Sequence, residues 1–464
     1  MLPVCWPRGR DRCLDTEHCD IETAFTNSDI DVEMYVEQME KFVEGGYQAD
    51  GKPKKVYRVK KALEGLKQSG NLHQVNNVDC LTKKCGMRQN TTEPCIFYKF
   101  QDGAVLALLV WVDDVWAAYS KGTREKIFMP WYKTYKETFK LKLLGEVKLF
   151  VGISISRDRE ARTITLSQSE YVKTMVKKFL TEDELKVVEP LPAVVYDKHG
   201  RETSHTKLLD IANLPIIAKS EEARTKFPFL SACASAMYAT SVTRFDCAHH
   251  TAFMSRFNIG PTDPAAKELK RLLNYMFHTA DKVTLTYGGS RIKIPDIPSA
   301  KPPLSPSNIV PLHGLLIITD GSLKSNNNYV GALVLMFNGV IDWGSTLLKV
   351  KLSTAEVEIA AGSYGAKRGM YVRNTFGEMF PLPRHATSHV IDNSALPSLT
   401  ENVGVSKKTE HFTRWLHYLR HLVQQGLSYV HLCRTHDMRA DPLTKVVARD
   451  AFYQFVKLGC NRPE

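Results

Sequence analysis

An apolar run extends from Val105 to Tyr119 and is interrupted by the polar pair Asp113 and Asp114. Two apolar, strand-like segments that meet at a polar pair predict a buried β-hairpin with the aspartates at its tip. Buried carboxylates repel each other and lose hydration unless a cation or hydrogen-bond donors keep them ionised. The stretch therefore fits a metal site, and it also fits a solvated turn, because Asp-Asp is an acceptable turn pair.

Three further segments show the spacing of amphipathic or buried helices. Residues 167–180 place apolar side chains on one face and lysines on the other. Residues 263–277 do the same, after an Asp-Pro pair typical of a helix start. Residues 352–376 are predicted to form a helix opened by Ser353 and Glu356, which suit a capping box.

Four acidic residues occupy special places in the predicted elements of the second half. In chain order they are Asp320 at the end of a buried strand, Glu358 on a helix, Asp392 at the end of another strand and Asp441 at a helix start. Taken singly, such residues more often serve capping or turns than catalysis. Glu358 has no capping role, and it lies near small residues that allow a helix to approach a sheet closely.

The chain has 464 residues, enough for two or three domains with cores of their own. Prolines gather in residues 290–311, and residues 181–226 are charged without sustained periodicity. Both segments are predicted to be linkers. After residues 290–311, strand-like and helical patterns alternate, as in an α/β domain.

Charge and cysteine usage narrow the class of protein. A net charge of +12 and a pI near 9.1 suit a polyanionic partner such as nucleic acid, and they equally suit an ordinary basic enzyme. The 10 cysteines show no zinc-ligand spacing, which predicts reduced thiols in an intracellular protein. The apolar runs are too short to span a bilayer, and residues 1–10 do not form a signal peptide.

Two short motifs resemble those of reverse transcriptases. Residues 111–114, WVDD, resemble the YVDD box, and residues 20–25, DIETAF, resemble the first catalytic motif of the same enzymes. Further matches, among them residues 56–68 and 144–153, extend the resemblance to the Pol polyproteins of Ty1/copia-type LTR retrotransposons. The resemblance covers nearly everything between Asp20 and Lys445 except the two predicted linkers.

The resemblance implies roles for residues of a polymerase site. Asp20 and Asp113 would bind metal, and Asp114 would shape the site. Phe25 would be the aromatic gate that excludes a ribose 2′-hydroxyl, and Gln68 would lie against the template or the incoming nucleotide.

A hairpin with Gly152 would grip the primer strand. The chain also departs from the family pattern at several positions: Ser69, Gly70, Asn71 and His73 stand where the family has Ala, Pro, Arg and Trp.

The four acidic residues of the second half resemble the DEDD carboxylates of ribonucleases H. The copia-type motifs around them match residues 320–322, 353–359, 391–393 and 440–445. The resemblance therefore carries metal-binding and catalytic roles to Asp320, Glu358, Asp392 and Asp441. Glu410 replaces a Lys of the family on a nearby helix, which is a departure.

The fold class implied is α+β followed by α/β: a reverse transcriptase palm and thumb with most of the fingers missing, then a ribonuclease H-like α/β domain. The expected domains are the palm with partial fingers and primer-grip hairpin at 1–180, a linker at 181–226, thumb or connection helices at 227–289, a Pro-rich linker at 290–311 and the ribonuclease H-like domain at 312–464.

The expected function is RNA-directed DNA polymerase with ribonuclease H activity, acting by phosphoryl transfer with two Mg²⁺ ions per site. The implied partners are an RNA template, a DNA primer, the RNA–DNA hybrid and deoxynucleoside triphosphates, with a possible dimer and no membrane. The resemblance also implies a fragment of a longer polyprotein in the cytoplasm, the nucleus or both. Two alternatives stay open: a decayed or domesticated remnant that binds nucleic acid without catalysis, and ribonuclease H activity alone.

Overall fold

The computed structural model describes residues 14–187, 195–196, 202–203, 216–218, 220–288, 314–323, 328–336, 339–348, 353–380, 386–401 and 413–460. The chain divides into two compact units, Met1–Val151 and Gly152–Glu464. Each is described by itself. The predicted linker at 290–311 and most of the one at 181–226 lie outside the described residues, and the bounds of the five predicted segments stay predictions.

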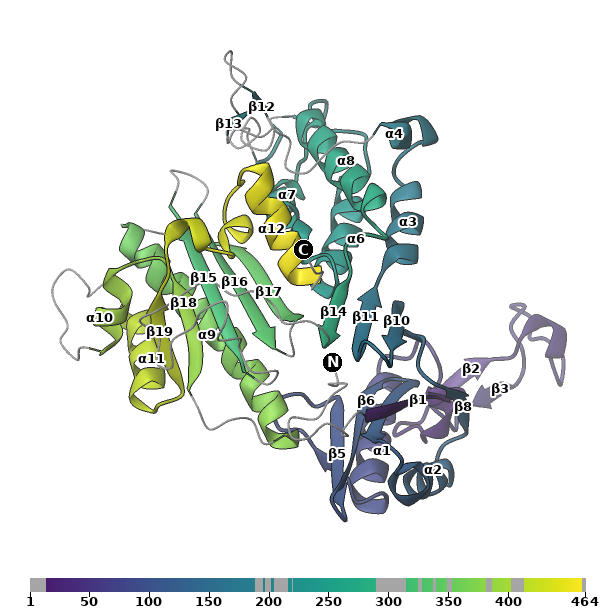
Figure 1. The fold of residues 1–464 in the computed structure, drawn as a ribbon. Coiled ribbons are helices and arrows are strands. Elements are labelled where there is room, and N and C mark those ends of the chain that lie inside the picture. The colour runs from purple at the N-terminus through teal and green to yellow at the C-terminus, as the bar shows by residue number, and fades with distance from the viewer. Residues whose placement is uncertain are drawn as a thin grey trace. The chain divides into compact units, whose positions relative to one another are not determined.

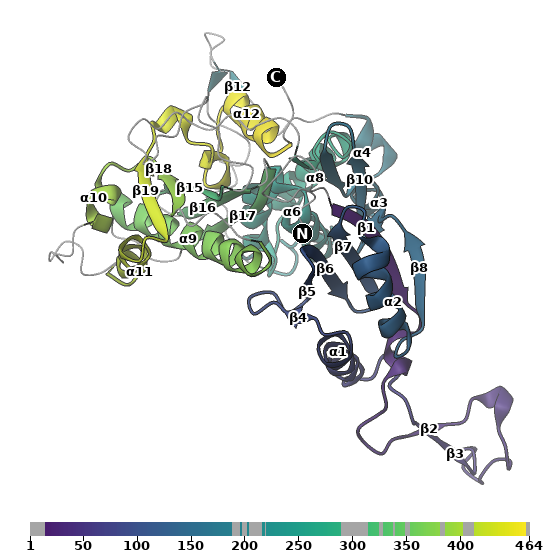
Figure 2. The ribbon, with the colours of Figure 1, turned by 60° about the horizontal axis from the view of Figure 1, so that its bottom comes forward.

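An antiparallel sheet of six strands organises the first unit, in the order β4-β5-β6-β7-β1-β8. The predicted hairpin is β6 and β7, and both strands lie in the middle of this sheet (β6 is labelled in Figure 1, both strands in Figure 2). The strands are β1 (Leu14–Ile21), β4 (Arg88–Gln89), β5 (Ile96–Gln101), β6 (Ala104–Trp111), β7 (Asp114–Ser120) and β8 (Leu141–Gly145).

Helices on the sheet close the core of this unit. Apolar side chains of β6 and β7, such as Leu106 and Ala117, pack with Leu81, Phe128 and Tyr135 from those helices. A separate hairpin, β2 with β3, projects from the unit (Figure 2). The remaining elements are η1 (Ala24–Asn27), β2 (Tyr35–Glu37), η2 (Glu40–Phe42), β3 (Val56–Arg58), α1 (Ser69–Asp79), η3 (Cys80–Lys84), η4 (Arg124–Phe128), α2 (Met129–Lys136) and β9 (Leu149–Phe150).

The second unit begins with strands and helices that share one apolar core. Strands β14, β11 and β10 are hydrogen-bonded in that order. The predicted helices at 167–180 and 263–277 are present as α3 and α8, and their apolar faces pack with α6 and α7. The elements are β10 (Ile153–Asp158), β11 (Thr163–Ser167), α3 (Ser169–Lys177), α4 (Glu182–Lys186), β12 (Val195–Tyr196), β13 (Glu202–Thr203), α6 (Phe229–Val242), η5 (Phe245–Cys247), α7 (Ala248–Met254), η6 (Ser255–Phe257), α8 (Asp263–His278) and β14 (Leu285–Gly288).

A mixed five-stranded sheet with helices forms the rest of the second unit. Its order is β17-β16-β15-β18-β19, with β15, β16 and β17 antiparallel and β15, β18 and β19 parallel. The elements are β15 (Leu316–Ser322), β16 (Tyr329–Met336), β17 (Gly339–Leu347), α9 (Thr354–Met379), β18 (Thr387–Ile391), α10 (Ala395–Glu401), α11 (Thr413–Gln424), β19 (Ser428–Leu432), η8 (Thr435–Asp437), η9 (Asp441–Leu443) and α12 (Arg449–Cys460). The predicted fold class, α+β followed by α/β, is confirmed.

Helix α9 crosses β15 and β16 at close range (Figure 1). A Cβ atom at Gly365 would collide with Thr319, and one at Gly369 would collide with Ile317. Glycine is therefore needed at both positions for α9 to lie this close to β15. Among the described residues, no helix combines the length and the apolar character that crossing a membrane requires.

Candidate active sites

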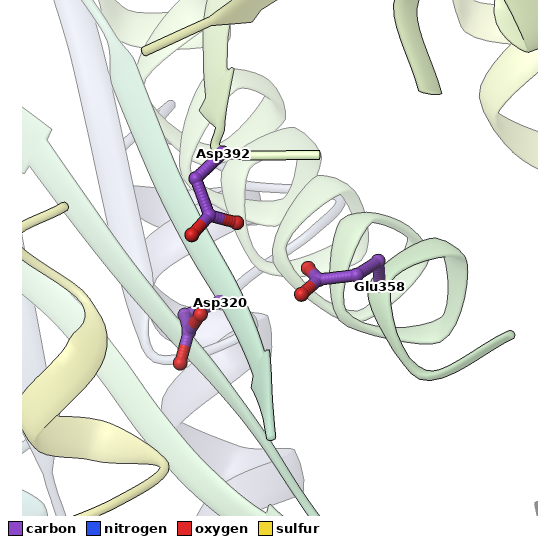
Figure 3. A group of neighbouring side chains, drawn as sticks. All are labelled: Asp320, Glu358 and Asp392. Atoms are coloured by element: carbon purple, nitrogen blue, oxygen red, sulfur yellow. The ribbon is translucent and has the colours of Figure 1, made fainter. Parts of the chain in front are cut away.

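Three carboxylates of the second unit converge at one end of its mixed sheet (Figure 3). Asp320 lies near the end of β15, Asp392 directly follows β18, and Glu358 lies in the second turn of α9. One oxygen of each lies within 4.8 Å of the others, a spacing suited to a shared metal ion. We call Asp320, Glu358 and Asp392 the acidic triad.

The register of the sheet explains why two members of the acidic triad meet. Strands β15 and β18 are parallel, with Ile318 opposite Val390. Asp320 and Asp392 each come two residues later, so they lie side by side at the same end of the sheet.

Glu358 reaches the triad because α9 lies close to β15. A Cβ atom at Gly321 would lie 2.9 Å from the backbone carbon of Val357, so the residue after Asp320 must be glycine for this approach. The local sequence thus places the helix turn that carries Glu358 directly against the strand that carries Asp320.

Burial and mutual repulsion dominate the electrostatics of the acidic triad. Asp320 and Glu358 are buried, and Asp392 is half-buried. Burial, together with the charges of Asp320 and Asp392, raises the pKa of Glu358 to about 9. Burial and the charge of Asp320 also raise the pKa of Asp392. The group therefore favours binding a positive species, either a proton or a metal cation.

Asp441 lies beside the triad and is connected to it through a lysine. Lys445 Nζ lies 2.9 Å from Asp441 Oδ1 and 3.7 Å from Asp320 Oδ2, and Thr444 Oγ1 donates a hydrogen bond to Asp320. Burial and the charge of Asp320 raise the pKa of Asp441 to about 7. The sequence predicted no role for Lys445 or Thr444, although both lie in the motif that marked Asp441.

In the first unit, the turn between β6 and β7 differs by one residue from the prediction. Trp111 pairs with Asp114, so the turn residues are Val112 and Asp113, and Asp114 is already the first residue of β7. Asp20 on β1 is paired with Asp114 on β7. Of the predicted polymerase carboxylates, Asp20 and Asp114 therefore lie on adjacent strands of one sheet, and Asp113 lies in the turn directly before Asp114.

As in the acidic triad, burial and neighbouring negative charges raise the pKa of a carboxyl group in this cluster. Burial, then the charges of Asp113 and Asp114, raise the pKa of Asp20. His18 Nε2 lies 2.9 Å from Asp114 Oδ1, an interaction that no sequence motif indicated. Within the described residues, the acidic triad is the one group of three potential ligands with this tight spacing, so the metal-binding roles in the first unit stay predictions.

Of the other predicted polymerase residues, Phe25 and Gln68 lie in the first unit and Gly152 lies in the second. Phe25 is half-buried on η1 and lines a cavity of about 220 Å³ together with His73 and Val112. Gln68 is the half-buried residue that precedes α1. Gly152 begins the second unit with a φ of +74°, a conformation that favours glycine. Their nucleic-acid roles stay predictions.

Comparison with known proteins identifies relatives over almost the whole chain. Residues 12–193 match the family described as Reverse transcriptase (RNA-dependent DNA polymerase). The retrovirus-related Pol polyprotein from transposon TNT 1-94 of Nicotiana tabacum is 28% identical over 444 residues, which cover 95% of this chain and 30% of that protein. The Pol polyprotein from transposon RE2 of Arabidopsis thaliana is 23% identical, covering 96% and 27%.

A more distant relative is the transposon Ty1-ER2 Gag-Pol polyprotein of Saccharomyces cerevisiae, 24% identical over 74% of this chain and 18% of that protein. The chain thus spans 30% or less of the length of these relatives.

Solved structures give weaker likenesses. The ribonuclease H1 of Halobacterium salinarum is 16% identical, covers 28% of this chain and 92% of its own, and has a TM-score of 0.22. The foamy viral protease-reverse transcriptase in complex with dsDNA is 12% identical, covers 92% and 71%, and has a TM-score of 0.22. Because both TM-scores are 0.22, the fold class is assigned from the strand order of the two units and not from these structures.

Proposed function

We propose, from the premise that the chain belongs to the Pol polyproteins of Ty1/copia-type retrotransposons, that it extends DNA primers on RNA and cleaves the RNA strand of RNA–DNA hybrids. The observation that carries this proposal is the acidic triad, three carboxylates brought together from separate elements. Templates, primers, hybrids and deoxynucleoside triphosphates are the proposed partners.

The donor set of the acidic triad fits Mg²⁺. Its three carboxylates are hard oxygen ligands, which this ion prefers. Without a cation, a pKa near 9 would leave Glu358 protonated at neutral pH. In the proposed function, Asp320, Glu358, Asp392 and Asp441 hold the metal, and Mg²⁺ bound there would activate the attacking oxygen and stabilise the leaving one.

The chain's own side chains orient these ligands. Thr444 donates to Asp320 and so fixes one of its oxygens, while Lys445 balances the charges of Asp320 and Asp441. Discrimination for RNA would come from contacts to 2′-hydroxyls and from the shape of the hybrid. Affinity would come mostly from Lys and Arg on phosphates, and it would therefore fall with added salt.

In the first unit, Asp20 and Asp113 are proposed to hold metal, and His18 orients Asp114. Phe25 is proposed to limit the space for a ribose 2′-hydroxyl, and Gln68 to contact the template or the incoming nucleotide. The paired positions of Asp20 and Asp114 on adjacent strands support this arrangement.

Two assays on the full chain test the proposal. A labelled RNA–DNA hybrid should be cleaved in Mg²⁺, and Asp392→Asn should abolish cleavage, while Asp450→Asn, at an exposed residue of α12, should not. Extension of a DNA primer on RNA should be lost in Asp113→Asn and kept in Asp102→Asn, at an exposed turn residue with a φ of +49° that Asn tolerates. The proposal would be contradicted if the wild type cleaved the hybrid no better than Asp392→Asn and extended the primer no better than Asp113→Asn.

Ribonuclease H activity alone is the second candidate. It is favoured because the tight carboxylate group found in the described residues lies in the second unit. Cleavage of the hybrid without primer extension would select this candidate, and loss of both would leave a nucleic-acid-binding remnant.

A further inference from the structure

Helix α1 places a buried histidine against the turn between β6 and β7. His73 is 3% exposed, and its Nε2 lies 2.9 Å from the carbonyl oxygen of Val112. A carbonyl can only accept a hydrogen bond, so Nε2 carries the proton. Nδ1 is buried and has no hydrogen-bond partner within the described residues, so the hydrogen bond of the ring is made through Nε2–H.

The turn that His73 contacts needs external support. Val112 has a φ of +54°, a left-handed conformation that is unfavourable for a β-branched residue. Two hydrogen bonds hold the turn from outside the hairpin. The N–H of Ile21 on β1 donates to the carbonyl of Asp113 at 2.8 Å, and His73 donates to the carbonyl of Val112.

The same imidazole ring also supports the predicted ribose gate. Its centroid lies 6.0 Å from that of Phe25, and the two rings are perpendicular, at 89°. On its other side the ring meets Phe139 edge-on, with centroids 5.8 Å apart. His73 thus contacts both the turn that carries Asp113 and the side chain of Phe25, and both line the same cavity.

We propose that His73 is a positioning residue of the polymerase site with two separable tasks. Its Nε2–H fixes the Val112–Asp113 turn and thereby the carboxylate of Asp113, and its ring fixes the orientation of Phe25. This inference rests on the proposed polymerase function.

Two substitutions separate the tasks. His73→Gln keeps an amide N–H donor at comparable reach and removes the ring. His73→Phe keeps the ring against Phe25 and Phe139 and removes the donor. Val75→Ala, at an exposed position of the same helix, is the control for general damage to α1.

Primer extension should respond differently to each change. In His73→Phe, the Mg²⁺ concentration for half-maximal extension should rise about fivefold, the factor that matches one lost hydrogen bond, while the preference for deoxynucleotides over ribonucleotides stays near that of the wild type. In His73→Gln, that preference should fall roughly two- to tenfold, as expected for one lost aromatic pair, while the Mg²⁺ requirement stays unchanged. A residue that serves only folding would shift both quantities and the thermal midpoint together.

A spectroscopic measurement on the full chain distinguishes failure of this inference from failure of the proposed function. ¹⁵N spectra of histidine-labelled protein, with the His73 signal identified by its loss in His73→Gln, should show the Nε2–H tautomer. The Nδ1–H tautomer, or an active wild type whose two variants match it in both quantities, overturns the inference. If the Nε2–H signal is present but wild type and Asp113→Asn both fail to extend a primer, the polymerase function is refuted, and with it the positioning role of His73 in that function.

Discussion

Removing one partner of the buried ion pair of Arg244 and Asp246 should destabilise the second unit more than removing one partner of an exposed ion pair. Both side chains are at most 1% exposed. The guanidinium donates to both carboxylate oxygens, at 2.9 and 2.8 Å. It also donates to the carbonyl of Met276 at 2.8 Å and to Thr279 Oγ1 at 2.7 Å, which ties the end of α6 to the end of α8.

Removal of one partner leaves the other charged and buried. Arg244→Leu should therefore destabilise the surrounding helices by about 3–5 kcal/mol. Asp246→Leu should cost a similar amount. The double variant should cost less than the sum of the two, by roughly 2 kcal/mol or more, because no uncompensated charge remains.

Hydrogen exchange followed by mass spectrometry gives the local opening free energy of α6 and α8, which is needed because a chain of two units does not unfold in one step. Arg224→Leu is the matched control. Its ion pair with Glu221 is similarly short, 2.7 Å, but has side-chain exposures of 40% and 81%, so its loss should change stability by about 0.5 kcal/mol or less. Equal effects of Arg244→Leu and Arg224→Leu, or additive effects in the double variant, would refute the reasoning.

Three further predictions concern the mixed sheet and its ligands. Burial and the charges of Asp320 and Asp392 raise the pKa of Glu358 to about 9, above its usual value of 4.5. Without divalent cations, the stability that the Glu358 proton provides should therefore be lost as pH rises from about 5 to 9. Glu358→Gln should flatten a plot of thermal midpoint against pH, and a slope equal to that of the wild type would contradict this assignment. Gly365→Ala should lower the local opening free energy of α9 by about 1–3 kcal/mol through the collision with Thr319. Gly70→Ala on α1, with nothing within 4 Å, should leave the local opening free energy of α1 unchanged or raise it, and hydrogen exchange measures both. Binding of an RNA–DNA hybrid, measured by fluorescence anisotropy with Asp392→Asn to prevent cleavage, should weaken steeply with salt, and a flat dependence would argue against phosphate contacts.

Local patterns were enough to predict the elements that carry the carboxylates. The strand that ends near Asp320, the strand before Asp392 and the helix that carries Glu358 each follow from a short stretch of sequence, and Ala360 and Ala361 do lie buried where α9 approaches the sheet. The hairpin of β6 and β7 was predicted with its turn one residue too late. Apolar alternation places a strand but does not choose between neighbouring turn positions, and here the turn takes the strained Val112.

The residues that support these carboxylates could not be predicted in the same way. His18 and Asp114 are 96 positions apart, His73 and Val112 are 39 apart, and Thr444 and Asp320 are 124 apart. A histidine or threonine has many ordinary roles in a core, and only the folded register brings it to a particular oxygen.

This difference has a physical origin. The carboxylates of the acidic triad lie near the end of a strand or in the first turns of a helix, and such positions leave a mark in the local sequence. A group that orients a carboxylate needs one donor at about 3 Å, and any element that passes nearby can supply it. Substitutions at His18 and His73 should therefore alter rates and metal requirement while leaving the carboxylate motifs intact, and such a chain would look active by motif and fail in the assay.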